Sequence, residues 1–154
     1  MVTVSTSRAR QSGKVSDESG DLAQALIEKH GGRVSGRALI PDDLDFLRRT
    51  LRRSLADKLV DVVVFTGGTG VSTTDVTIEA VRPFFEKEIE GFGEIFRSIS
   101  YKKVGSAAAL SRATAGIAKK KVVLCIPGSP DAVRTALEMF LGEIPHVFSL
   151  ANGR

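Results

Sequence analysis

The feature that most constrains the fold is an apolar run followed at once by a glycine-rich turn. Residues 60–65 read VDVVVF, and residues 66–70 read TGGTG. A run so uniformly apolar is typical of a central strand covered on both faces, as in parallel sheets. The glycines then let the backbone turn tightly or come close to a ligand, because they carry no Cβ atom.

Strand-like runs alternate with helical patterns along the whole chain. This alternation predicts an α/β fold, a three-layer α/β/α arrangement with a mostly parallel central sheet. The 154 residues, of which 42% are hydrophobic, suit a single domain over residues 1–154. The expected strands are a short one starting near Met1, then 33–40, 60–65 and 122–126. Residues 6–16 are expected to form a loop, and a first helix then starts at Ser16 or Asp17 and ends at Gly31. A second helix starts at Pro41, and a third starts near Thr74 or Asp75 and stops around Pro83. Helix is also expected over most of 92–118, and a last helix starts with Ser129 as its cap.

Composition removes several classes of function. No apolar run is long enough to span a membrane, and residues 1–13 lack the apolar stretch of a signal peptide, so a cytoplasmic protein without membrane contact is expected. The single cysteine, Cys125, excludes an internal disulfide and is expected to be a small buried strand residue. His30, expected to help end a helix, and His146 belong to no cluster of metal ligands or nucleophilic triad.

The net charge of +4 suits nucleic acid, but equally a phosphorylated small molecule. Its densest part is a set of four arginines, expected on a solvated helix face opposite Leu44, Leu47, Leu51 and Leu55: Arg48, Arg49, Arg52 and Arg53. No nucleic-acid motif accompanies them, and the chain has one tyrosine and no tryptophan for stacking on bases. A nucleic-acid partner is therefore not expected.

Two glycine-bearing turns, 66–70 and 127–129, follow predicted strands. In open α/β sheets ligands bind beyond the carboxyl ends of the strands, where both turns must lie. Consecutive amides in 66–70 can bind an anion, although a tight turn without a ligand explains the glycines equally well. The turn is neither a P-loop, which needs a following Gly-Lys-Ser/Thr, nor the dinucleotide fingerprint, since Ser72 and Thr73 replace its third glycine.

Two aspartates, Asp42 and Asp75, come just after predicted strands. A carboxylate pair beside a phosphate-binding loop is what Mg²⁺ prefers. The alternatives are structural: Asp42 can cap a helix after Pro41, and Asp75 and Glu79 can lie in a first helical turn to complement the helix dipole.

Several ordered motifs together carry a family resemblance. TGGTG at 66–70 is followed by DVT at 75–77 and EA at 79–80, and then by GFGE at 91–94, LSRA at 110–113 and PGSP at 127–130. Ser5 to Arg8 and DESG at 17–20 also fit. With these motifs the chain resembles the molybdenum cofactor biosynthesis proteins of the MogA/MoaB family, the molybdopterin adenylyltransferases, with 89–130 most similar to the MoaB-type branch.

The resemblance implies transfer of AMP from Mg-ATP to the terminal phosphate of molybdopterin, with release of pyrophosphate. It implies that Asp42 and Asp75 are catalytic and hold Mg²⁺. Residues implied to cradle phosphate are Gly67, Gly68, Thr69 and Gly70, and those implied to line the pterin and nucleotide site are Ser111, Arg112, Pro127, Gly128 and Ser129. Thr6 and Thr74 replace an aspartate and an arginine that many relatives carry. A non-catalytic molybdopterin-binding or assembly protein on the same scaffold is the alternative.

The family resemblance further implies a homotrimer or homohexamer, with other cofactor-biosynthesis proteins as further partners. Four of the eight phenylalanines fall within thirteen residues: Phe84, Phe85, Phe92 and Phe96. Aromatic clusters are enriched at subunit contacts, so Phe92 and Phe96 are expected to support assembly. The alternative is that these rings cap the sheet within one chain.

Overall fold

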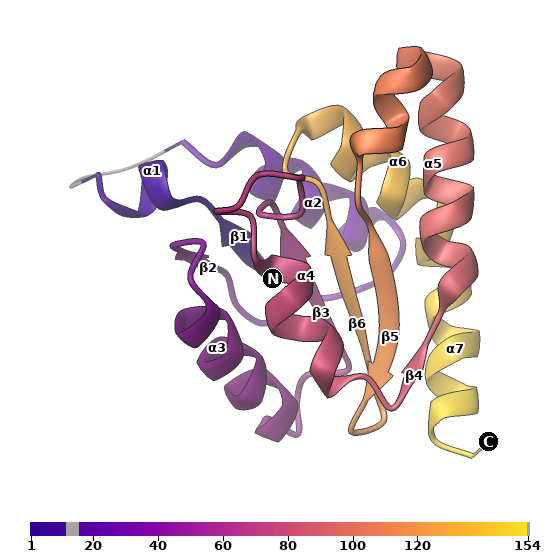
Figure 1. Ribbon diagram of the computed structural model, residues 1–154. Helices are drawn as coiled ribbons and strands as arrows, with labels where there is room; N and C mark the ends of the chain where they lie inside the picture. Colours follow the sequence, from indigo (N-terminus) through magenta and orange to yellow (C-terminus); the bar gives the residue numbers. More distant parts are fainter. Residues whose placement is uncertain (12–15, 154) are drawn as a thin grey trace.

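The computed structural model describes residues 1–11 and 16–153, which form one mixed sheet with helices on both faces (Figure 1). The strands of this described part are β1 (Val2–Val4), β2 (Ala38–Ile40), β3 (Val62–Thr66), β4 (Lys87–Glu88), β5 (Thr114–Ala118) and β6 (Lys121–Ile126). Their order across the sheet is β2-β1-β3-β6-β5-β4. The first four in this order are parallel, whereas β5 and β4 are antiparallel to their neighbours. The predicted mostly parallel sheet is confirmed.

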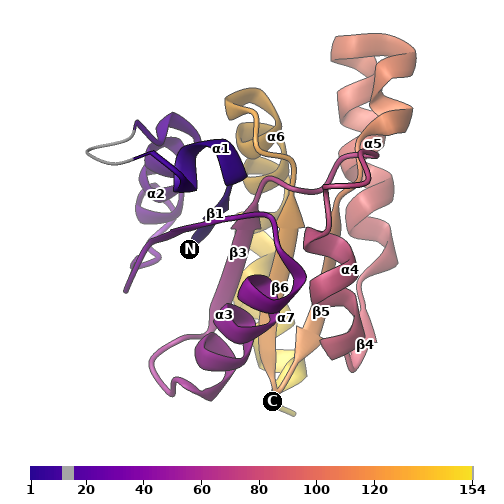
Figure 2. The ribbon, with the colours of Figure 1, turned by 60° about the vertical axis from the view of Figure 1, so that its left-hand side comes forward.

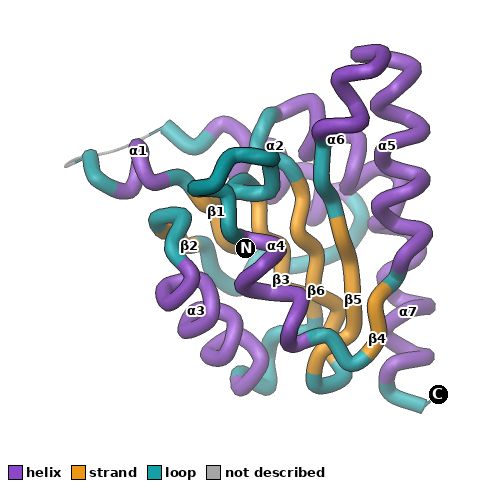
Figure 3. The backbone as a smooth tube through the Cα atoms, in the orientation of Figure 1, coloured by secondary structure: helices purple, strands orange, loops and turns teal. Residues whose placement is uncertain are grey.

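Helices cover both faces of the sheet and give the expected three layers (Figures 2 and 3). One face carries α2 (Glu18–Lys29), α5 (Glu90–Val104), α6 (Pro130–Phe140) and α7 (Ile144–Ala151). The other carries α3 (Leu44–Ala56) and α4 (Thr77–Val81). The remaining elements are the single turn α1 (Thr6–Ala9) and three 3-10 segments, η1 (Arg82–Phe84), η2 (Gly105–Leu110) and η3 (Leu141–Glu143). No helix in the described ranges is both long and apolar enough to cross a membrane.

Strand β3 is apolar throughout because both of its faces are covered. Val64 belongs to the core under α2 and α6, whereas Val63 and Phe65 belong to the core under α3 and α4. On neighbouring β6 the fully buried Cys125 also faces the α3 side, as a small strand residue. Burial raises the pKa of its thiol, which therefore stays protonated.

The leucine pattern of α3 buries three of its four predicted residues. Leu47, Leu51 and Leu55 lie in the core, but Leu44, at the first turn, is 37% exposed. The arginines of the opposite face include Arg49, Arg52 and Arg53, which are exposed, and Arg48, which is half-buried. The predicted end of α2 is also confirmed, since His30 lies at its C-cap with its ring Nδ1 2.9 Å from the carbonyl oxygen of Leu26.

The prediction of helix for most of 92–118 is wrong over residues 114–118, which form β5. This segment reads TAGIA, and its alanines and glycine have little intrinsic preference for a strand. Pairing decides its structure: it forms an antiparallel hairpin with β6 through Lys119 and Lys120, both with positive φ. The glycine of β5 has a packing role, because a Cβ atom at Gly116 would lie 2.5 Å from the ring of Phe85.

Three other boundaries differ from expectation. The strand predicted over 33–40 is regular only at 38–40, where it pairs with β1. The helix after the glycine turn begins at Thr77 rather than near Thr74, because residues 71–76 form a loop. Of the loop expected over 6–16, residues 6–9 form the turn α1 with Ser5 as cap, and residues 12–15 lie outside the described residues.

The phenylalanines expected to support assembly are core residues of a single chain. Phe92 is 2% exposed and Phe96 is 1% exposed. The ring of Phe92 packs edge-on against Phe140, with 5.0 Å between the ring centroids. The interface role expected for Phe92 and Phe96 is therefore wrong, because α5 uses both rings to dock on the sheet and α6.

This burial makes a prediction about stability. Phe96→Ala should lower the free energy of unfolding by about 3–5 kcal/mol, since it removes a buried ring and leaves a cavity. The melting temperature should fall by about 10 °C, while the mass measured by light scattering stays that of the wild-type protein. Ile95→Ala is the control, because Ile95 on the same helix is 55% exposed and its loss should shift stability by about 0.5 kcal/mol at most. Equal effects of the two variants would contradict the core assignment.

Candidate active site

The predicted site residues follow β2, β3 and β6 or stand just before β5. They therefore lie at the edge formed by the carboxyl ends of the parallel strands, which Figure 1 shows at one side of the sheet. The turn after β6 lies against the turn after β3, since a Cβ atom at Gly128 would lie 3.0 Å from the Cα atom of Gly67. The segment after β2 joins them, because the amide of Val76 donates to Oδ1 of Asp42 at 3.1 Å. Three loops from distant parts of the chain therefore form one edge, as the strand order requires.

The glycine turn is built so that side chains cannot replace its glycines. Gly67 and Gly68 have φ angles of +99° and +63°, a region that L residues rarely adopt. A Cβ atom at Gly68 would overlap both the carboxylate of Asp42 and the hydroxyl of Thr77. The buried Thr77 fixes the turn, because its hydroxyl donates to the carbonyl of Gly67 and its amide to the carbonyl of Gly68, each at 2.9 Å. Thr77 belongs to the DVT motif, but its role as a brace was not predicted.

Neither of the two predicted catalytic aspartates is explained as a helix cap. The N-cap of α3 is Asp43, whose carboxylate accepts from the amides of Asp45 and Phe46. The N-cap of α4 is Val76, which makes no side-chain cap bond. Asp42 is therefore not the cap of α3. Asp75 precedes the first turn of α4, whereas Glu79 lies in that turn, as its structural alternative expected.

The two aspartates instead face the glycine turn. A Cβ atom at Gly70 would lie 2.6 Å from Oδ2 of Asp75, and the same oxygen accepts from the amide of Ser72 at 3.2 Å. Asp42 is partly buried, and burial raises the pKa of its carboxyl, with further increases from the negative charges of Asp75 and Glu79. The protein thus gathers negative charge at one point beside the turn.

A pocket of about 330 Å³ opens beside Asp75. Arg112, which comes just before β5, crosses one side of it and binds Glu79 through both terminal nitrogens, with Nη1 2.5 Å from Oε1 and Nη2 3.2 Å from Oε2. The ion pair lowers the pKa of Glu79. The other residues that line this pocket are Gly70, Val71, Ser72, Thr73 and Val76.

The remaining predicted residues lie around the same edge, and two of them make contacts that support the fold. Ser129 caps α6, since its hydroxyl accepts from the amide of Ala132 at 3.3 Å. The carbonyl of Gly128 accepts from the buried Ser19 hydroxyl at 2.6 Å, which ties the start of α2 to this turn. Pro127 directly follows β6, and Ser111 is half-buried next to Arg112.

The described residues contain no group of three or more histidine, cysteine, aspartate or glutamate side chains that could hold a metal ion. Asp42 and Asp75 alone therefore offer an incomplete set of ligands. Mg²⁺ commonly binds in this way, through one or two carboxylates together with phosphate oxygens of a substrate.

The model of a protein family described as a probable molybdopterin binding domain matches residues 1–146 of the chain. The chain belongs to this family. The match covers every loop that forms the site edge, and the family resemblance of the sequence motifs is thereby confirmed.

Relatives of known name match this chain over most of their own lengths. Molybdenum cofactor biosynthesis protein B of Bacillus subtilis (strain 168) is 40% identical over 149 residues, which are 96% of this chain and 85% of that protein. Molybdopterin adenylyltransferase of Pyrococcus furiosus is 41% identical over 156 residues, with 99% and 89% covered. A crystal structure of molybdenum cofactor biosynthesis protein B superposes with a TM-score of 0.91 at 39% identity, with 99% and 94% covered. The MoaB-type resemblance is thus confirmed.

In this family member, Asp17 organises the part of the edge next to β1. Its carboxylate accepts from the Thr3 hydroxyl at 2.7 Å, from Arg37 at 2.9 Å, from the Gly20 amide at 3.1 Å and from Arg8 at 3.4 Å. Although burial alone would raise the pKa of this carboxyl, these hydrogen bonds hold it below its ordinary value. The sequence predicted only a helix cap here, because the partners come from segments that meet only in the fold.

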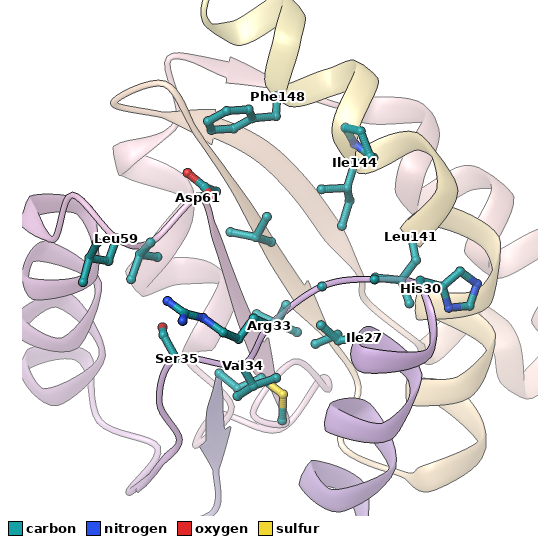
Figure 4. A pocket seen from close by; sticks show the side chains of 17 residues that line it. Ile27, His30, Arg33, Val34, Ser35, Leu59, Asp61, Leu141, Ile144 and Phe148 are labelled. Carbon is teal, nitrogen blue, oxygen red and sulfur yellow. The ribbon is translucent and has the colours of Figure 1, made fainter.

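A second pocket, of about 310 Å³, lies at the opposite edge of the sheet (Figure 4). It is formed at the amino ends of β1 and β3 by the end of α2 and by α7, with Ile27, Ile144 and Phe148 pointing into it. Because ligands of parallel sheets bind at the carboxyl ends, this pocket is not the candidate active site.

The raised pKa of Asp42 predicts a pH dependence of stability. The folded protein binds this proton more tightly than the unfolded chain, whose ordinary value is 3.8. The stability gained from Asp42 is therefore complete below that value and is lost as pH rises through the raised pKa. At pH 7 the ionised carboxylate lowers stability, so Asp42→Asn should raise the melting temperature of the ligand-free protein. The amide oxygen of Asn can still accept from Val76.

Scanning calorimetry from pH 3 to pH 8 tests this expectation. The excess melting temperature of Asp42→Asn over the wild-type protein should shrink as the pH falls towards 3.8. A variant that melts below the wild-type protein at pH 7, or a difference independent of pH, would show that the charge on Asp42 does not lower stability.

Proposed function

We propose that this protein transfers AMP from Mg-ATP to the terminal phosphate of molybdopterin and releases pyrophosphate. The observation that carries the proposal is the convergence of Asp42 and Asp75, neither of them a helix cap, on a glycine turn with left-handed backbone. The printed names of relatives, among them a molybdopterin adenylyltransferase at 41% identity, support the same reaction.

The reaction needs little acid–base chemistry from the protein. A terminal phosphate oxygen of molybdopterin attacks the α-phosphorus of ATP and forms a new P–O bond. The bond from the α-phosphorus to the bridging oxygen of the β-phosphate breaks, and its electron pair leaves with pyrophosphate. Because the attacking oxygen is already anionic at neutral pH, no histidine or cysteine is required, and positioning and charge neutralisation do most of the work.

Each part of the site then has a defined task. The amides of Gly68, Thr69 and Gly70 bind phosphate oxygens as hydrogen-bond donors. The amide of Gly67, which was also expected to bind phosphate, instead donates to the carbonyl of Ile126 at 2.9 Å and joins the turn to β6. Asp42 and Asp75 would hold Mg²⁺, which when bound neutralises charge on the transferred phosphoryl group. The pocket bordered by Asp75 and Arg112 accepts part of the nucleotide or pterin.

Incubation of the purified protein with molybdopterin and Mg-ATP tests the proposal. Adenylylated molybdopterin and pyrophosphate should appear in equal amounts, and neither should appear when Mg²⁺ is omitted. Molybdopterin that binds tightly but stays unmodified would overturn adenylyl transfer and leave the alternative, a non-catalytic molybdopterin-binding or assembly protein on this scaffold.

The proposal includes self-association as a trimer or hexamer and delivery or collection of the pterin by other cofactor-biosynthesis proteins. Light scattering at micromolar concentration measures the first part. A monomer would overturn it.

A further inference from the structure

The guanidinium of Arg112 forms its hydrogen bonds with other groups of the protein. Its Nε donates to the carbonyl oxygens of Thr69, at 2.9 Å, and Gly70, at 3.0 Å. Its Nη2 reaches the carbonyl of Asp75 at 3.5 Å, and both terminal nitrogens bind Glu79. The side chain therefore joins both ends of the loop that follows β3 to the first turns of α4.

We infer that Arg112 is a positioning residue that orients the phosphate-binding amides of the glycine loop, rather than a residue that contacts phosphate. The inference rests on the proposed adenylyl transfer, because it assigns phosphate to the amides of this loop.

The geometry of the peptide group fixes the direction of two amides in the glycine loop. In a trans peptide the carbonyl and the following amide point in opposite directions, and the described chain contains no cis peptide. Because Arg112 holds the carbonyls of Thr69 and Gly70 on its own side, the amides of Gly70 and Val71 are held on the opposite side. Neither amide donates to another residue of the described part of the chain. Both are therefore available to an anion.

The positive charge of Arg112 is neutralised within the protein. A free arginine beside a phosphate site would attract phosphate directly, but Glu79 neutralises this one through two contacts. The lowered pKa of Glu79 keeps that carboxylate ionised at neutral pH. With its donors taken by Glu79 and three carbonyls, Arg112 has little left to offer a ligand.

The position of Arg112 in the chain attaches it to the sheet. It stands two residues before β5, which is paired with β6 over its full length. A rigid sheet thus supports a loop that otherwise contains three glycines in four positions. Such a loop loses much conformational entropy when it orders around a ligand, and a brace fixed in advance reduces that cost.

Two measurements on Arg112→Met test the inference: amide hydrogen exchange of peptides covering 67–75, and calorimetric affinity for Mg-ATP. Exchange of the hydrogen-bonded amides of the loop, those of Ser72, Thr74 and Asp75, should accelerate about tenfold, because the brace that closes the loop is gone. The affinity for Mg-ATP should fall about tenfold in the same variant. Arg134→Met is the matched control, since Arg134 also forms an exposed ion pair, with Glu138, but contacts no carbonyl of the glycine loop. It should leave both quantities at wild-type values.

A second pair of variants separates positioning from direct contact. Arg112→Lys keeps the charge but not the planar fork, so its loop should still exchange faster than in the wild-type protein. Glu79→Gln keeps a neutral acceptor for Arg112, so the affinity for Mg-ATP should not rise. A rise in that variant, or loss of affinity in Arg112→Met with unchanged loop exchange, would show direct contact and overturn the inference. If Arg112→Met does not fold, Arg112→Lys decides by the same two measurements.

The same experiments distinguish failure of the proposed reaction from failure of the positioning role of Arg112. If wild-type protein forms no adenylylated product, adenylyl transfer is wrong whatever the variants do. Hydrogen exchange of the loop does not depend on turnover, so unchanged exchange in Arg112→Met overturns the positioning role alone.

Discussion

Gly68→Ala should reduce adenylyl transfer about a hundredfold or more, although it adds only one methyl group. The added Cβ atom would overlap the carboxylate of Asp42 and the hydroxyl of Thr77. The left-handed backbone at this residue, with φ of +63°, costs an L residue a further 1–2 kcal/mol or so. The loop must therefore shift, and the shift displaces both an aspartate proposed to hold Mg²⁺ and the amides proposed to bind phosphate.

Steady-state kinetics and calorimetry with Mg-ATP measure this effect, with Gly91→Ala as the matched control. A Cβ atom at Gly91 meets nothing within 4 Å, and the residue lies in the first turn of α5. That variant should keep wild-type affinity and turnover. Wild-type affinity for Mg-ATP in a folded Gly68→Ala protein would show that the turn has no part in binding nucleotide.

The second large effect concerns the carboxylates. Asp42→Asn and Asp75→Asn should each lower the rate of adenylyl transfer by at least about tenfold, because each removes a formal charge needed for metal binding with almost no change in volume. Asp42→Asn should do so even though it raises the melting temperature. A more stable but less active protein would indicate that the gathered negative charge exists for the reaction and not for the fold.

The control is the neighbouring aspartate. Asp43→Asn also removes one negative charge, and asparagine caps a helix as well as aspartate does, so α3 should persist. Its turnover should match that of the wild-type protein. Equal losses in Asp43→Asn and Asp42→Asn would attribute the effect to overall charge, and unchanged turnover in both Asp42→Asn and Asp75→Asn would remove them from the reaction.

The parts of the fold that could be predicted from sequence are those set by local patterns. The buried β3 could be recognised because its apolar run has no polar face, and α3 because its leucines recur at helical spacing. The hairpin partner β5 could not, because TAGIA owes its structure to pairing with β6 and to the ring of Phe85. Likewise, the four-residue spacing of Phe92 and Phe96 places both rings on one face of α5, but it does not show whether that face meets the sheet or another subunit.

In the candidate site, too, the positions of the main residues could be predicted from sequence, but the contacts that hold them could not. The positions of Asp42, Asp75 and the glycine turn follow from the rule that ligands bind at the carboxyl ends of strands. The contacts that give these residues their geometry come from distant segments: Arg112 precedes β5, Thr77 begins α4, and Asp17 gathers partners from β1 and residue 37. Such bracing depends on tertiary structure, and a single sequence contains no local signal for it.

The two outermost strands of the sheet restrict how copies of this protein can meet. β2 has three residues and β4 has two, and Pro41 directly follows β2. Edges this short offer few unpaired backbone groups, so they are poor templates for a strand from another molecule. Subunits of the proposed oligomer should therefore join through helices and loops, each keeping its own complete sheet. Such edges protect the protein against open-ended, strand-by-strand aggregation.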